Sequence, residues 1–80
     1  MASEVERWHI GERYYGVTAA STPHGLDLEL DDLGPGVGRG LVAIASLPDD
    51  SEAISLQVFG AGALPIEVLE QFIAEARRRL

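Results

Sequence analysis

The C-terminal stretch Leu64–Leu80 constrains the fold more than any other part of the sequence. Its apolar residues recur with a helical period and fall within one stripe about 100° wide, with Val68 on the flank. The stripe comprises Pro65, Ile66, Leu69, Phe72, Ile73, Ala76 and Leu80. Proline suits the first turn of a helix, and the arginines come late, as the helix dipole favours. An isolated helix of this length is marginal in water, so the stripe must dock against an apolar surface.

Strands upstream of the helix are expected to supply that surface. Leu26–Asp32 has the cleanest pattern, because its leucines alternate with acidic residues and so occupy one face of a strand. Similar patterns predict strands over residues 4–10, 13–21, 26–32, 41–47 and 53–59. The short connections favour antiparallel pairing. We therefore expect an α+β domain of two layers, in which an antiparallel meander of four to five strands packs on one C-terminal helix.

Glycine and proline mark the connections between these elements. Gly11 followed by Glu12 predicts a two-residue hairpin turn, and Gly16 predicts a bulge or a close approach of two chain segments. Residues 33–40 form a glycine-rich hairpin loop. Residues 1–3 are expected to fray. No linker or internal repeat interrupts the chain, so residues 1–80 are interpreted as one domain.

The charge balance narrows the classes of partner. Thirteen acidic residues stand against six basic ones, all of them arginine, which gives a formal net charge of −7. This charge disfavours nucleic acids and anionic membranes, whereas it suits a basic protein partner or serves solubility alone. The absence of cysteine excludes disulfides and favours the cytoplasm, and no apolar run is long enough for a signal peptide or a membrane span. Arginine without lysine, with abundant alanine and glycine, is typical of GC-rich bacterial or phage coding.

Motifs of catalysis and ligand binding are weak. The glycine-rich loop precedes a strand instead of a helix, which argues against a phosphate site. His9 and His24 lack the spacing of metal ligands on one element. Asp27, Glu29 and Asp31 alternate with leucines and are expected to face water, whereas acid–base catalysis by paired carboxylates needs one of the pair to be buried. We expect no catalytic residue, cofactor or metal.

Two groups of side chains, and one arginine, are instead candidates for binding a partner. The first group is acidic and is expected to join the carboxylates of residues 49, 50 and 52 in one negative patch. The second is aromatic and serves either as an interface anchor or as ordinary sheet packing. The arginine lies in the glycine-rich loop. The candidates are Asp27, Glu29, Asp31 and Asp32, then Trp8, Tyr14 and Tyr15, and finally Arg39.

These features favour a small acidic, non-enzymatic protein that binds another protein, and in size and charge the chain is similar to small immunity and inhibitor proteins. Two alternatives stay open. Leu41–Leu47 is apolar on both faces, and one helix covers only one of them, so a homodimer is the first alternative. A small-molecule site between sheet and helix is the second. The terminal arginines 77–79 are interpreted as charges that complement the helix dipole, not as a nucleic-acid site.

Overall fold

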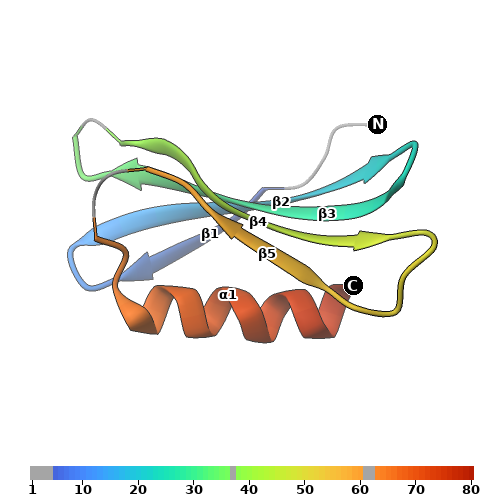
Figure 1. Cartoon of the computed structure of the whole chain (residues 1–80). Coiled ribbons are helices and arrows are strands. Elements are labelled where there is room, and N and C mark those ends of the chain that lie inside the picture. Colours follow the sequence, from blue (N-terminus) through green and yellow to red (C-terminus); the bar gives the residue numbers. More distant parts are fainter. Residues whose placement is uncertain (1–4, 37, 61–62) are drawn as a thin grey trace.

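An antiparallel sheet covered on one face by a single helix forms the whole architecture (Figure 1). It is seen in a computed structural model, which describes residues 5–36, 38–60 and 63–80. The elements are β1 (Val5–Ile10), β2 (Arg13–Thr22), β3 (Gly25–Gly34), β4 (Gly40–Pro48), β5 (Ser55–Val58) and α1 (Ile66–Arg79). The strands lie in the order of the sequence and all neighbours are antiparallel, which confirms the expected meander with a C-terminal helix. The terminal residues expected to fray lie outside the described residues.

The first hairpin forms at the turn that the sequence predicted. Ile10 lies opposite Arg13, so Gly11 and Glu12 are the only residues in the loop. Gly11 has a φ of 64°, whereas no described residue other than glycine has a positive φ. A positive φ at the first loop position alone is typical of a type II′ turn, whose twist matches that of the paired strands. β1 is therefore a separate edge strand and does not merge with β2.

Strand alternation places the core on the face that α1 covers. Val17 lies opposite Leu30 and Tyr15 lies opposite Asp32 across β2 and β3, so these four side chains share one face. The apolar side chains in this set are fully buried, as is Leu28 one step further along β3. The predicted leucine face of β3 is thus confirmed at its centre, where burial of each leucine contributes about 1.5–3 kcal/mol.

The helix presents a different side to the sheet from the one its sequence predicts. The buried residues are Val68, Phe72 and Ala76, which recur every four residues along one line. Val68 was expected on the flank of the stripe and is fully buried, whereas Ile66 was expected in the stripe and is 66% exposed. Both expectations are wrong, because the helix is rolled so that Val68 points at the core.

Ion pairs at the end of α1 are consistent with this orientation. Glu75 pairs with Arg78 and with Arg79, as expected for residues three and four apart on a helix. Arg79 also reaches Glu6 on β1, with 3.6 Å between Nη1 and Oε2. The exposed pairs contribute little individually. They nevertheless tie the side of α1 that carries Glu75 and Arg79 to the β1 edge of the sheet.

The sheet has two irregularities near the glycine-rich loop. The register shifts between Tyr14 and Tyr15 where β2 pairs with β3, and between Leu30 and Asp31 where β3 pairs with β4. Extra residues of this kind increase the local twist and re-aim side chains. Beyond them β3 continues to Gly34 and β4 already begins at Gly40, so the loop is shorter than the expected 33–40.

In the described part of the chain no helix has the length and apolarity needed to span a bilayer.

Candidate protein-binding face

The face of the sheet that α1 leaves bare carries a row of acidic side chains. Asp27, Glu29 and Asp31 alternate along β3 with the buried leucines and are only partly exposed. Residues two apart on one strand face lie about 7 Å from each other. The ion pairs formed by described residues involve Asp32, Glu75 and Glu6, and none involves this row. We call these three carboxylates the acidic row. None of them forms an ion pair with a described residue, and Arg7, a cation on the same face, lies two strands away from Asp31 across Gly16.

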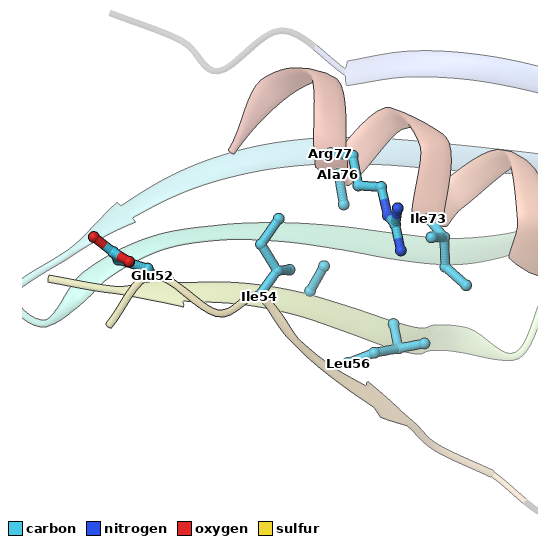
Figure 2. Close-up of a pocket in the computed structure, with 7 residues that line it drawn as sticks. Glu52, Ile54, Leu56, Ile73, Ala76 and Arg77 are labelled. Atoms are coloured by element: carbon cyan, nitrogen blue, oxygen red, sulfur yellow. The ribbon is translucent and has the colours of Figure 1, made fainter. Parts of the chain in front are cut away.

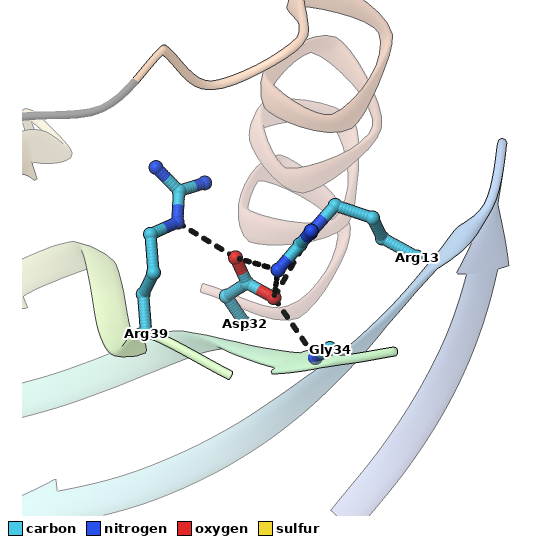
Figure 3. Close-up of polar contacts among 4 residues, drawn as sticks. All are labelled: Arg13, Asp32, Gly34 and Arg39. Carbon is cyan, nitrogen blue, oxygen red and sulfur yellow. Dashed lines mark hydrogen bonds and ion pairs between the residues drawn. The ribbon is translucent and has the colours of Figure 1, made fainter. Parts of the chain in front are cut away.

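Asp32 does not belong to this row, although the sequence grouped it there. It lies opposite Tyr15 on the helix-facing side, where it is 1% exposed. Figure 3 shows its carboxylate held from several directions. Arg13 donates from Nη2 to both oxygens at 3.0 and 3.1 Å and from Nε at 3.3 Å. Arg39 donates from Nε at 2.7 Å, and the backbone N–H of Gly34 donates at 3.0 Å. The expectation that Asp32 is a surface contact is therefore wrong.

The environment of Asp32 keeps it ionised. Burial is the largest single influence and by itself raises the pKa of this carboxyl. The hydrogen bonds from Arg39, Gly34 and Arg13, with the positive charge of Arg13, together outweigh burial and hold the pKa of Asp32 below its ordinary value of 3.8. Charge-assisted hydrogen bonds of this kind are the strong ones in proteins. Asp32 is thus a stable anion at neutral pH.

Asp32 and its three hydrogen-bond donors, Arg13, Gly34 and Arg39, form a cluster that fixes the end of the glycine-rich hairpin. Arg39 was expected to contact a partner, but its Nε is committed to Asp32, while its side chain stays 35% exposed and its terminal nitrogens point away from the carboxylate (Figure 3). Gly38 packs so tightly on the preceding strand that a Cβ there would lie 2.1 Å from the carbonyl oxygen of Asp32. A side chain cannot fit at that distance. The glycine is therefore required for the hairpin to fold back over Asp32.

The aromatic group is divided between the two faces of the sheet. Trp8 is 8% exposed and Tyr15 is fully buried, so both belong to the core under α1. The hydroxyl of Tyr15 is buried and has no hydrogen-bond partner within residues 5–36, 38–60 and 63–80. Tyr14 alone reaches the bare face, where its ring stacks on His9 with centroids 4.4 Å apart and planes inclined by 11°. Of the two alternatives left open by the sequence, core packing is therefore confirmed for Trp8 and Tyr15, and Tyr14 alone stays a candidate interface anchor.

Apolar side chains at one end of the acidic row were not predicted as part of a site. Val5 and Leu33 meet above Gly16, where an added Cβ would lie 3.3 Å from the first and 3.4 Å from the second. The close approach expected at Gly16 is therefore confirmed. Leu41 lies opposite Asp31 and is 39% exposed. The two-sided apolar pattern of residues 41–47 was the sequence signal for Leu41, whereas Leu33 is exposed by the bulge and left no such signal.

The remaining acidic residues that were expected to join the acidic row lie in two different places. Asp49 and Asp50 lie in the exposed turn after β4, next to the turn after β2, where the N–H of Asp49 donates to the carbonyl of His24. Glu52 lines a groove on the helix side of the sheet.

Over residues 5–36, 38–60 and 63–80, no three His, Asp or Glu side chains gather in a way that could hold a metal ion.

Comparisons with family models, with curated proteins and with solved structures find no significant match to this chain.

Proposed function

We propose that this chain is a non-enzymatic module of the cytoplasm that binds a basic protein through the bare face of its sheet, in the manner of an inhibitor or immunity-type factor. The observation that carries the proposal is the acidic row, Asp27, Glu29 and Asp31, which runs along the bare face and forms no ion pair with any residue that the structure describes. Unpaired carboxylates on one strand repel each other modestly, and a cationic partner would relieve that repulsion.

The charge of the whole chain supports the same class of partner. A formal net charge of −7 repels phosphate backbones and anionic lipids, and it attracts basic surfaces over distances of about a Debye length, roughly 8–10 Å at physiological salt. Such attraction mainly raises the association rate. Apolar contact must then supply much of the lasting affinity, and Tyr14, Leu33 and Leu41 are exposed beside the row for this purpose.

The one buried carboxyl of the described chain favours binding over catalysis. A general acid needs a pKa raised towards neutrality, as burial without a partner would produce. Asp32 has the opposite shift, because Arg39, Gly34 and Arg13 hold its pKa low. The cluster therefore suits a structural role that supports the hairpin at the edge of the binding face.

The proposal predicts that neutralising the acidic row weakens partner binding. The variant D27N/E29Q/D31N keeps the shapes of the side chains and removes three negative charges. We expect a basic partner, captured from the source cell with the wild-type chain and then purified, to bind this variant roughly 10- to 100-fold more weakly at low salt, mainly through a slower association rate. Surface plasmon resonance over a series of salt concentrations measures both effects, and the salt dependence should flatten in the variant.

A matched variant separates the row from net charge. E52Q/E67Q/E70Q removes the same number of charges from exposed residues that belong to the connection before β5 and to α1. It should retain nearly all of the association rate. Equal weakening by both variants, or a partner whose binding ignores ionic strength, would contradict a site on the bare face.

A further inference from the structure

The two edges of the sheet have different chemistry. β1 carries the charged residues Glu6 and Arg7, and Glu6 is paired with Arg79. Charged side chains on an edge strand disfavour its pairing with a strand of another chain. β5 (Ser55–Val58) carries no charge at all, and all four of its residues are exposed. Within the described chain β5 pairs only with β4, which leaves its outer backbone groups available. A neutral, exposed edge strand is a template for pairing with another strand.

A groove lined mainly by aliphatic side chains, with Glu52 and Arg77 also in its lining, adjoins this edge on the helix side. It has a volume of about 470 Å³, and Figure 2 shows Ile54 and Leu56 on one side of it and Ile73 and Ala76 of α1 on the other. Ile54, Leu56 and Val58 are 38%, 41% and 51% exposed. Three large aliphatic side chains at successive alternate positions thus stay in contact with water. An exposed apolar strip of this kind marks an interaction surface.

The roll of α1 enlarges the same surface. The residues of α1 that are buried, Val68, Phe72 and Ala76, point in a direction that differs from the centre of the apolar stripe. With 100° of rotation per residue, the two directions lie about 60° apart around the helix axis. The part of the stripe left uncovered includes Ile66 and Ile73, which lie on the same side of the helix, and Ile73 lines the groove beside β5. The apolar sides of α1 and β5 therefore face one unfilled space.

We infer that the β5 edge pairs antiparallel with β5 of a second copy of this chain, which joins the two sheets into one. The two-fold axis passes midway between the two opposing Leu56 residues, perpendicular to the sheet. In antiparallel pairing, directly opposite residues point to the same face. A register that sets Leu56 opposite Leu56 therefore keeps both helices on one side and merges the two grooves, as an isologous interface requires.

The edge is complementary to itself in this register. Ile54 meets Val58 of the second copy, and Ser55 meets Gln57, so apolar residues oppose apolar ones and polar residues oppose polar ones. Glu52 falls opposite Gly60 of the second copy, which keeps the two acidic turns apart despite a net charge of −7 on each chain. The paired segment is short, and interfaces of this size are typical of weak pairs with dissociation constants above about 1 µM.

Disulfide trapping tests the register directly, because the chain contains no cysteine of its own. Leu56→Cys places two thiols directly opposite each other, with Cα atoms about 4.5–5.5 Å apart, which a disulfide can span. Gln57→Cys is the matched control, since its exposed side chain points to the other face and its Cα atoms would be more than about 7 Å apart. Under mild oxidation, Leu56→Cys should form covalent dimer at least about tenfold faster than Gln57→Cys.

Sedimentation velocity over a concentration series tests the edge without oxidation. Wild type should dimerise reversibly, and Leu56→Lys should raise the dissociation constant at least about tenfold, because two like charges would then face each other at the axis. Val5→Lys adds the same charge at the exposed β1 edge and should dimerise like wild type. A wild-type monomer at the highest concentration, equal behaviour of the two lysine variants, or faster cross-linking by Gln57→Cys would each overturn the inference.

Discussion

Replacement of Phe72 by alanine is expected to lower the free energy of unfolding by about 3–5 kcal/mol. Phe72 is fully buried at the centre of the line through Val68 and Ala76, and it belongs to the same core cluster as Tyr15 and Leu28. Truncation removes buried apolar surface and leaves a cavity that the sheet cannot fill by collapse. Because domains of this size have only about 5–15 kcal/mol of total stability, the variant should be close to unfolding.

Urea denaturation followed by tryptophan fluorescence measures this change, since Trp8 is the only tryptophan and lies in the core. Ile66→Ala is the matched control on the same helix, because Ile66 is 66% exposed. It should cost no more than about 0.5 kcal/mol in the monomer. The measurements belong at low protein concentration, where the proposed dimer is dissociated. Comparable losses at both positions would mean that the helix is rolled towards Ile66, as its sequence stripe suggests, and not towards Val68.

The sequence predicted the sheet and the helix well because their signals are local. Alternation in Leu28 and Glu29 identifies both the strand and its buried face, and the helical period from Pro65 onwards identifies α1. Gly11 marks its turn through a backbone conformation that other residues avoid. Each of these signals depends on residues within a few positions of each other, so no tertiary information is needed to interpret them.

The roll of α1 could not be predicted in this way. A helix with an apolar stripe can dock at a range of angles about its own axis, and the choice depends on contacts distant in sequence. Here Arg79 reaches Glu6, and the side chain of Val68 points into the core. Which side of the stripe stays uncovered depends on which side docks against the sheet. The groove beside β5 could therefore not be predicted from the sequence either.

The candidate binding face was predicted in part, and Asp32 shows where the prediction failed. Asp32 was predicted to belong to the acidic row because it is an acidic neighbour of Asp31. Asp32 nevertheless lies two and four residues from Leu30 and Leu28 on the same strand, so its side chain points to the same, buried face. The alternation of side chains along the strand would by itself have predicted a buried carboxylate, which needs cationic partners. The partners themselves, Arg13 and Arg39, are 19 and 7 residues away and could not be identified without the register of the sheet.

Replacement of Asp32 by asparagine should destabilise the domain by about 1–3 kcal/mol at neutral pH. The amide keeps the shape of the side chain and can still accept from the N–H of Gly34, but it cannot compensate the charges of Arg13 and Arg39. Both arginine side chains are about one-third exposed, so water recovers part of their solvation and the loss stays below that of a fully buried pair. Asp31→Asn is the control, since this neighbour on the bare face makes no ion pair with another described residue, and it should be within about 0.5 kcal/mol of wild type.

Acid titration then identifies the charge of Asp32 as the cause. The pKa of Asp32 is lower in the folded chain than its ordinary value of 3.8, so folding favours its ionised form. Its contribution is fully present above the unfolded pKa and is lost as the pH falls through the lower folded pKa. The gap in unfolding free energy between wild type and Asp32→Asn should therefore be largest near neutral pH and close progressively below about pH 4. Glu75, whose pKa is also lowered, first by its hydrogen bond from Arg78, is common to both proteins and cancels from the difference. A gap that persisted unchanged into strong acid would assign the loss to packing and would remove the electrostatic role of the cluster.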